Sequence, residues 1–482
     1  MPDQCKTLGI FLPNCIEYPL VFSGAARANV TTTTLNPAYT PREISKQLSL
    51  SNVSHLVTDS EHLPIIEETK KLVDNFIQVI LTDEECSTQN HLSLQQLVKE
   101  HDISGSSKVG INVHKDIVTM PFSSGTTGLP KGVMLTHFNL VSNLIQMLGA
   151  HPDISIMDES NDLSPNVLLS VLPMYHIYAM HVSMGNALRT GTTIVSLPKF
   201  EPKSYTEALQ RYRPTILHLA PPLVNFLVTN SDVKSWHLDS VKDVLSAAAP
   251  LGPALYEQFK TKFPKTVLRE VWGMSETSPL ATITPKSTVK VGSCGVAVPN
   301  AQIKIVDVET GNNLPPMKTG ELCVAGPMNM KGYLNNKKAT DETVKDGWLH
   351  SGDIAYYDED GYVFIVDRIK ELIKVKGYQV SPTELEDLIR TMDGVKDVAV
   401  IGIPHSKYGE VPRAYIVRLA ASELSALSPN VSEESVKEFV SENVTSYKQL
   451  AGGVEFIEAI PKSAAGKILR RVLTQEFKNR GK

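Results

Sequence analysis

Between about residues 110 and 285, short apolar runs alternate with amphipathic helical stretches. The runs predict buried strands at 167–172, 193–197, 215–219, 241–245 and 267–272. Amphipathic helices are predicted between them, at 202–212, 222–228 and 253–263. Strands that alternate with helices in this way predict parallel β/α layers. Ligands of such sheets bind beyond the carboxyl ends of the strands, where this chain has polar or unusual residues at 173–178, 246–250 and 272–276.

The pattern changes after about residue 290. Short strands separated by Gly, Asn and Asp turns predict an antiparallel lobe there, without a helix. Past Arg368 a smaller α+β unit is expected. Its first helix begins with Ser381 as N-cap and Pro382 at the first position, and Glu384 closes a capping box. The rest of this unit is predicted to contain strands at 398–403 and 414–419, a mobile loop at 420–432 and a helix near 433–440. A last basic helix is predicted from Lys467.

The predicted fold class is therefore α/β. A large N-terminal domain of layered β/α subdomains with an antiparallel β lobe spans residues 1–368, and a small, mobile α+β C-terminal domain spans residues 369–482. The opening stretch at 8–20 reads as a buried strand followed by the start of a helix.

Composition excludes several function classes. A net charge of −5 without a Lys/Arg block argues against a nucleic-acid binder that works by counterion release. Five cysteines with neither an even disulfide pattern nor C-x-x-C spacing favour a reducing compartment and argue against a structural zinc. The chain has neither the ~18-residue apolar run of a membrane helix nor a signal-peptide pattern, and its last residues are not S-K-L. We expect a cytoplasmic monomer or weak dimer with small-molecule partners; a peroxisomal location stays open.

Residues 121–132 read P-F-S-S-G-T-T-G-L-P-K-G. Hydroxyls, backbone N–H groups and one cation can together surround phosphate oxygens, so this stretch predicts a nucleotide-phosphate loop formed by Ser123, Ser124, Gly125, Thr126, Thr127, Gly128 and Lys131. A solvated turn is the alternative. No G-K-[ST] follows, and both flanks read as strands, so the loop is predicted to join two strands, with the first helix starting near Thr136.

The stretch S-S-G-T-T-G-L-P-K-G-V is similar to the signature of the acyl-adenylate-forming superfamily, the ATP-dependent AMP-binding enzymes. Within it, the chain most resembles 4-coumarate-CoA ligase-like and luciferase-like acyl-CoA synthetases. The resemblance implies that ATP activates a carboxylic acid to acyl-AMP, releasing pyrophosphate, and that the acyl group passes to CoA, with Mg²⁺ as the metal. Two alternatives remain: an adenylate-forming enzyme with another acceptor, such as a carrier protein or oxygen, or a truncated, impaired nucleotide-binding homologue, because the large domain looks short at its N-terminus.

The resemblance assigns several residues to the nucleotide. Glu276 in W-G-M-S-E resembles the Mg²⁺-binding glutamate, and Thr127 could share the metal. Trp272 stands where relatives more often have a Tyr stacked on adenine. Asp353 and Arg368 match the pair that holds the ribose hydroxyls and phosphate. The remaining residues implied at the nucleotide are Ala248, Glu270, Val271 and Ser275.

Lysines in the small domain resemble the family's two catalytic faces. Lys467 resembles the lysine that bridges carboxylate and α-phosphate during adenylation. Lys370 falls at the family's hinge, and a second face, for thioester formation, comprises Lys374, Lys376, Gly377 and Gln379. Swinging the domain would offer each face to one site in turn. Outside such motifs, lysines are ordinarily solvated charges.

The acid pocket is predicted from P-M-Y-H-I-Y, in which His176 and Tyr178 resemble pocket-bordering residues of 4-coumarate-CoA ligases. His176 could also guide the thiol, although a packed histidine is the alternative. Ala247 and Val271 stand where aryl-activating relatives commonly have Gly, and the added volume favours an aliphatic or otherwise slim carboxylate. Pro279 and Leu280 would line the pocket without a charge, which argues against an amino-acid substrate.

Overall fold

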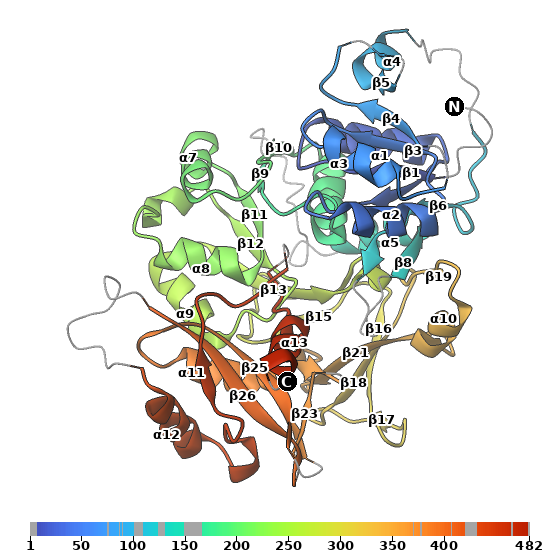
Figure 1. The fold of residues 1–482 in the computed structure, drawn as a ribbon. Helices are drawn as coiled ribbons and strands as arrows, with labels where there is room; N and C mark the ends of the chain where they lie inside the picture. Colours follow the sequence, from blue (N-terminus) through green and yellow to red (C-terminus); the bar gives the residue numbers. More distant parts are fainter. Residues whose placement is uncertain are drawn as a thin grey trace.

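The computed structural model describes most of the chain (Figure 1). The described residues are 7–74, 77–85, 87–88, 90–100, 109–123, 131–148, 166–369, 371–375, 378–405, 407–419, 431–463 and 466–480. Within them, two β/α sheets, an antiparallel lobe and a C-terminal sheet follow one another along the chain, which confirms the predicted α/β class.

The first sheet has the strand order β19-β8-β6-β2-β1-β3-β4-β5. Strands β2, β1, β3, β4 and β5 are parallel to their neighbours, whereas β8 is antiparallel to β6. Its elements are β1 (Thr7–Ile10), α1 (Glu17–Arg27), β2 (Thr31–Thr34), α2 (Pro41–Leu50), β3 (His55–Thr58), α3 (Leu63–Lys70), β4 (Gln78–Leu81), β5 (His91–Ser93), α4 (Leu94–Glu100), β6 (Ile117–Thr119), β7 (Phe122–Ser123), β8 (Lys131–Thr136), α5 (His137–Leu148) and β19 (Gly332–Tyr333).

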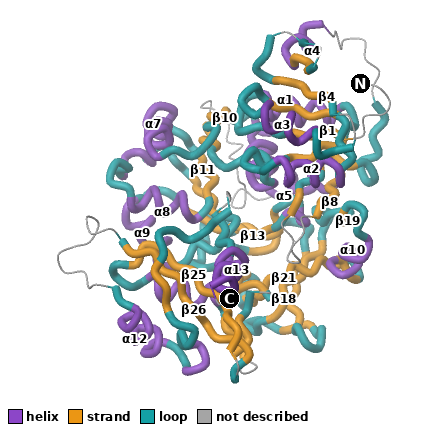
Figure 2. The backbone as a smooth tube through the Cα atoms, viewed as in Figure 1, coloured by secondary structure: helices purple, strands orange, loops and turns teal. Residues whose placement is uncertain are grey.

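The second sheet has the order β10-β9-β11-β12-β13-β14-β15, and its strands from β10 to β13 are parallel, as predicted. Helices α7, α8 and α9 lie along its outer face (Figure 2). Its elements are β9 (Val167–Ser170), the π-helix η1 (Tyr178–Gly185), α6 (Asn186–Thr190), β10 (Thr193–Ser196), α7 (Pro202–Tyr212), β11 (Ile216–Leu219), α8 (Pro221–Thr229), η2 (Ser235–Leu238), β12 (Asp243–Ser246), α9 (Pro253–Lys262), β13 (Val267–Gly273), η3 (Ser275–Thr277), β14 (Leu280–Ile283) and β15 (Val296–Ala297).

An ion pair is buried on the inner face of this sheet. Arg269 on β13 donates through Nε and Nη2 to both carboxylate oxygens of Asp243 on β12, and Nη1 donates to the carbonyl of Thr284 at 3.0 Å. The side chains are 0% and 5% exposed. Both charges are therefore satisfied inside the protein, and neither can be removed alone without leaving the other buried and unpaired.

Replacing Arg269 with alanine is expected to lower the free energy of unfolding by about 3–5 kcal/mol, because Asp243 stays buried without a cation. Unfolding in urea measures this loss. The double variant Arg269→Met with Asp243→Leu removes both charges and is expected to recover most of the stability. A double variant as unstable as the single one would show that the charge on Asp243 is not the cause.

The lobe after residue 290 is antiparallel, in the order β17-β16-β18-β21-β20 with β22 paired to β21. Its elements are β16 (Gln302–Val306), β17 (Asn313–Leu314), β18 (Gly320–Ala325), α10 (Lys337–Thr343), β20 (Val344–Lys345), β21 (Trp348–Tyr357) and β22 (Val363–Arg368). The expectation of a lobe without a helix is wrong: α10 forms because the side chain of Asn336 accepts a hydrogen bond from the N–H of Ala339.

The C-terminal sheet has the order β24-β23-β26-β25, with β27 paired to β26. Its elements are β23 (Ile373–Val375), β24 (Tyr378–Val380), α11 (Pro382–Arg390), β25 (Val395–His405), β26 (Gly409–Arg418), α12 (Glu433–Asn443), η4 (Ser446–Lys448), β27 (Val454–Phe456) and α13 (Arg470–Arg480). Most of the loop predicted at 420–432 falls outside the described residues.

Two predictions about helix ends in this unit need correction. Ser381 is the N-cap of α11, but the carboxylate of Glu384 accepts from Lys448 Nζ at 2.6 and 2.7 Å instead of closing the capping box. The last helix begins at Arg470 rather than at Lys467. Lys467 belongs to a preceding turn, in which its carbonyl accepts from the N–H of Ser463 at 2.8 Å.

Two further properties are the apolar length of the helices and the state of the cysteines. Within the described residues, none of the helices is long and apolar enough to span a membrane. Among the described cysteines, Cys15, Cys294 and Cys323 are free thiols, and burial raises the pKa of Cys294 to about 12.

Candidate active site

Several of the described candidate residues come together from β7, the end of β13 and β21. Ser123 Oγ donates to Glu276 Oε1 at 3.1 Å, which joins the first sheet to the end of β13. Trp272 Nε1 donates to Asp353 Oδ2 at 2.9 Å, which joins β13 to the lobe. Three separate segments of the chain therefore contribute to one site.

The predicted phosphate loop lies between two antiparallel strands, as expected. Ser123 on β7 pairs with Lys131 on β8, and α5 follows β8 directly. The Lys131 ammonium lies 4.8 Å from the centre of the Tyr333 ring. The loop residues themselves lie outside the described part of the chain; these are Ser124, Gly125, Thr126, Thr127 and Gly128.

Glu276 is a carboxylate suited to a hard cation. It is 4% exposed, and its Oε1 accepts hydrogen bonds from the hydroxyls of Ser123 and, at 2.8 Å, Tyr333. None of the described salt bridges pairs it with a cationic side chain. A buried carboxylate neutralised only by hydroxyl donors fits Mg²⁺, which prefers oxygen ligands.

A close backbone approach places Glu276 and Trp272 at the end of β13. Gly273 lies between them, and a Cβ at this position would lie only 1.9 Å from the carbonyl oxygen of Pro279. Any other residue would push the two chain segments apart. The W-G-M-S-E motif therefore needs its glycine for packing, independently of any ligand.

Asp353 is the centre of a second polar group. It is 5% exposed, with Oδ2 bound to Trp272 and Oδ1 located 3.0 Å from Arg368 Nε. The approach of Arg368 is outside hydrogen-bond geometry, so Oδ1 has no hydrogen-bond partner among the described residues. A buried acceptor without a donor fits the ribose hydroxyls that the resemblance implies.

The turn that carries Asp353 is held from β18. Glu321 accepts through Oε2 from His350 Nδ1 at 2.7 Å and through Oε1 from the N–H of Gly352 at 3.1 Å. Ser351 Oγ donates to the carbonyl of Leu322 at 2.7 Å. These bonds fix the direction of the Asp353 carboxylate.

Lys467 reaches this site from the C-terminal unit. The surrounding protein and then the Arg368 guanidinium lower the pKa of its ammonium, whereas Asp353 and Glu276 act in the opposite direction. The residue is nevertheless exposed to solvent. Burial, followed by the nearby Lys467 cation, lowers the pKa of His176 to about 4, so the imidazole is neutral at physiological pH.

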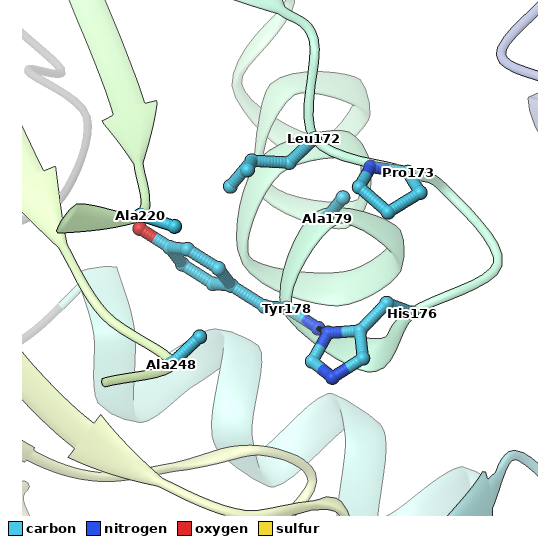
Figure 3. Close-up of a pocket in the computed structure, with 7 residues that line it drawn as sticks. All are labelled: Leu172, Pro173, His176, Tyr178, Ala179, Ala220 and Ala248. Atoms are coloured by element: carbon cyan, nitrogen blue, oxygen red, sulfur yellow. Dashed lines mark hydrogen bonds between the residues drawn. The ribbon is translucent and has the colours of Figure 1, made fainter. Parts of the chain in front are cut away.

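The predicted acid pocket is a small cavity next to His176. It is lined by Leu172, Pro173, His176, Tyr178, Ala179, Ala220 and Ala248 (Figure 3). The Tyr178 side chain extends from the helical segment toward Ala220, and its hydroxyl donates to the carbonyl of Leu245 at 3.0 Å. The cavity has a free volume of about 10 Å³, which is room for about one water molecule.

The remaining predicted pocket residues are outside the lining of this cavity. Ala247 and Val271 are 9% and 6% exposed at the ends of neighbouring strands. Leu280 belongs to the same apolar cluster, and Pro279 is buried beside it. Ala248 has a φ of 74°, the left-handed region that few non-glycine residues adopt. Such outliers are concentrated at functional sites.

Other predicted residues are not brought to the site. The Lys374 side chain is exposed on β23, and the Glu270 carboxylate instead accepts from the N–H of Leu251 at 3.1 Å. Ser275 opens η3 and is partly buried. The remaining members of the second face, Lys370, Lys376, Gly377 and the side chain of Gln379, lie outside the described residues.

Sequence reasoning missed two residues and one contact of the site. Tyr333 contacts both Glu276 and Lys131, Glu321 orients the Asp353 turn, and the Trp272 N–H binds Asp353. The only signal for Tyr333 was a Gly-Tyr pair in a turn-rich stretch. Each contact joins residues far apart in the chain, which local patterns do not reveal.

Comparisons with known proteins identify the family of this chain. The family model described as AMP-binding enzyme matches residues 3–334, and the model of the AMP-binding enzyme C-terminal domain matches residues 384–467. The chain is 41% identical to 4-coumarate–CoA ligase 2 of Nicotiana tabacum, over 97% of this chain and 84% of the relative. ATP-bound MatB from Rhodopseudomonas palustris gives a TM-score of 0.86 at 26% identity, covering 99% of this chain and 90% of that one. The apo structure of MatB, also 26% identical, covers 99% of this chain and 89% of that one with a TM-score of 0.74.

The two family models together match most of the chain, in the order expected of a large and a small unit. The chain therefore belongs to the AMP-binding enzyme family, as an AMP-forming ligase that activates a carboxylic acid with ATP to acyl-AMP and transfers the acyl group to CoA.

Proposed function

We propose that this ligase forms the acyl-adenylate with Lys467 as the catalytic cation. The observation that carries the proposal is the position of Lys467, which lies in the electrostatic field of Arg368, Asp353 and Glu276. One carboxylate oxygen of the acid attacks the α-phosphorus, and pyrophosphate leaves. Lys467 holds the attacking carboxylate against the α-phosphate and stabilises the negative charge that develops there. Lys131 and the phosphate loop hold the departing phosphates.

Other residues orient the nucleotide. Trp272 stacks on adenine, and its N–H donates to Asp353 Oδ2, which leaves Oδ1 for the ribose hydroxyls. Arg368 donates to the ribose or the phosphate. Glu276, with Thr127, would hold Mg²⁺, which neutralises phosphate charge when bound. The backbones of Ala248, Glu270 and Val271, together with Ser275, border the nucleotide.

Thioester formation uses the second face of a small domain, residues 369–482, which rotates about Lys370 against the large domain, residues 1–368. Lys374 is exposed on β23, as expected of a face that is used only in the second step. In that step, Lys374, Lys376, Gly377 and Gln379 approach the adenylate, and neutral His176 accepts a hydrogen bond from the CoA thiol. The greater similarity to the ATP-bound than to the apo relative supports an adenylation-ready arrangement.

The acid is an aliphatic or otherwise slim carboxylate. Ala247 and Val271 narrow the pocket at the ends of β12 and β13. The Tyr178 side chain extends across the cavity next to His176, toward Ala220. Pro279 and Leu280, which we assign to the pocket, are uncharged, so an amino acid would bury its ammonium without a partner.

Changing both Ala247 and Val271 to glycine is expected to raise kcat/KM for aryl acids by about 10-fold or more, since single methylene groups in such pockets change selectivity by this amount. Pyrophosphate release with cinnamic and hexanoic acids measures the change. Ala249→Gly, in the same loop but unassigned to the pocket, controls for added backbone freedom. An unchanged acid preference would remove these two side chains as determinants of pocket width.

A panel of carboxylic acids, scored for pyrophosphate release with and without CoA, tests the whole proposal. We expect acid-dependent pyrophosphate release, and acyl-CoA together with AMP only when CoA is present. Acid-dependent release followed by adenylate accumulation in the presence of CoA would favour another acceptor. No release with any acid would contradict the proposed chemistry.

We also propose a cytoplasmic monomer or weak dimer. The free thiols of the described cysteines support a reducing compartment. Light scattering over a range of protein concentrations tests the assembly state.

A further inference from the structure

A layer of polar side chains lies directly beneath the wall of the acid pocket. His218 on β11 is two residues before Ala220, and Ala220 continues the strand in an extended conformation. Residues two apart on a strand face the same side. The ring of Tyr178, which lines the pocket, stacks over the His218 ring with a centroid distance of 6.1 Å and an interplanar angle of 25°. His218 therefore lies one layer below the pocket wall, about 6–7 Å deeper along the strand.

Polar atoms of three residues in this layer lack hydrogen-bond partners among the described residues: His218, Ser170 and Ser196, the register partner of Ser170. His218 Nδ1 lies 2.9 Å from Ser183 Oγ, but Nε2 is buried without a hydrogen-bond partner among the described residues. Because Leu217 pairs with Leu169, the next residue, Ser170, is beside His218. Ser170 Oγ is likewise buried and unpartnered within the described chain. We call Ser170, Ser183 and His218 the pocket floor.

An unsatisfied buried donor or acceptor costs about 1–3 kcal/mol, and native proteins leave few of them. Two such atoms on adjacent strands, below a cavity, indicate a place for an occupant. The occupant is uncharged, because the only cation on this face of the sheet among the described residues, Arg269, is fully engaged by Asp243. Burial and then Arg269 lower the pKa of His218 to about 3, so its imidazole is neutral.

We infer that the pocket floor binds a hydroxyl group at the far end of the acid substrate. A hydroxyl both donates and accepts, so it pairs with either tautomer of His218 and with the Ser170 hydroxyl. A terminal methyl would leave both atoms unpaired, and a second carboxylate would be buried without a cation. This inference rests on the proposed function, and with the narrowing by Ala247 and Val271 it specifies the substrate class as slim aliphatic hydroxy acids.

The test compares acids matched in length. Hexanoate is paired with 6-hydroxyhexanoate, octanoate with 8-hydroxyoctanoate and decanoate with 10-hydroxydecanoate, and kcat/KM is measured from pyrophosphate release. In the wild-type enzyme, we expect the hydroxy acid to be favoured about 10-fold in at least one pair, the equivalent of one well-placed hydrogen bond. In His218→Leu the ratio should fall to about one, and His218→Gln, which keeps a donor and an acceptor, should restore part of it.

Three controls make the outcome decisive. His237→Leu removes another buried histidine, in η2 at the opposite end of the strands, and should keep the preference. Ser170→Ala changes little volume and should also reduce the ratio, which covers the case that His218→Leu folds poorly. His218→Leu removes an unpaired nitrogen but also the partner of Ser183 Oγ, so its thermal unfolding midpoint, compared with that of Ser170→Ala, measures the structural effect of the substitution separately from the change in selectivity.

Acids that turn over without hydroxyl preference in any pair would mean that the floor holds only water, and would overturn the inference while leaving the proposed ligase chemistry intact. A preference that survives both His218→Leu and Ser170→Ala would also overturn it. The absence of pyrophosphate release with every acid would contradict the proposed function and this inference together.

Discussion

Replacing Lys467 with alanine is expected to lower acid-dependent exchange of pyrophosphate into ATP by about 10²- to 10³-fold, the usual loss when one group that stabilises transition-state charge is removed. Lys467 is the cation that the C-terminal turn brings into the field of Asp353 and Glu276. Formation of acyl-CoA from supplied acyl-adenylate should be nearly unaffected, because the α-phosphorus has already been attacked. Isotope exchange and single-turnover thioester assays measure the two steps separately.

The matched control is Lys374→Ala, which should show the reverse result: normal exchange and slow thioester formation. Lys478→Ala removes an exposed lysine from α13 and should change neither step. Equal losses in both half-reactions for Lys467→Ala would contradict the division of labour between the two lysine faces.

Replacing Asp353 with asparagine is expected to raise the KM for ATP and lower kcat/KM by about 10²-fold, since hydrogen bonds to a charged group contribute about 1.5–3 kcal/mol each. The carboxamide keeps one acceptor oxygen, so its NH₂ group would face either Arg368 or Trp272 Nε1, and both of these are donors themselves. Steady-state kinetics with ATP varied at saturating acid measures the effect.

Trp272→Phe separates the two roles of the indole. The ring remains available for stacking, but the N–H donor to Asp353 is lost, so we expect a smaller loss of about 10-fold. Asp360→Asn, an exposed carboxylate in the same lobe, serves as the neutral control. If Trp272→Phe matched the wild type while Asp353→Asn did not, the indole N–H would have no part in holding the carboxylate.

The strands of the second sheet were predictable because parallel strands covered on both faces form continuous apolar runs. Helix α7 has its predicted ends: Pro202 begins it, and Arg213, with a φ of 46°, ends it. Helix α10 was missed because it is short and its start depends on one side chain, Asn336. The capping box at Glu384 failed because Lys448, distant in sequence, binds the carboxylate more directly.

The candidate site likewise combines residues that were predictable from the sequence with contacts that were not. Resemblance to the family's motifs pointed to Glu276, Asp353, Arg368 and Lys467, because each belongs to a short run of characteristic residues. The bonds that hold two of them, from Tyr333 to Glu276 and from Trp272 to Asp353, connect residues 57 and 81 positions apart. Only the packing of separate sheets creates such pairs. The unpaired nitrogen of His218 could not be predicted either, because the apolar run at 215–219 indicates only a buried strand.

The phosphate loop lies between β7 and β8 rather than at the start of a helix. A helix N-terminus would supply a permanent positive field of about half a charge, but here the positive charge is carried by side chains, and Lys467 belongs to the C-terminal unit. In the proposed cycle, that charge departs when the unit rotates. Pyrophosphate then attacks the adenylate only inefficiently. Rotation therefore makes the first step nearly irreversible and directs the activated acid to CoA.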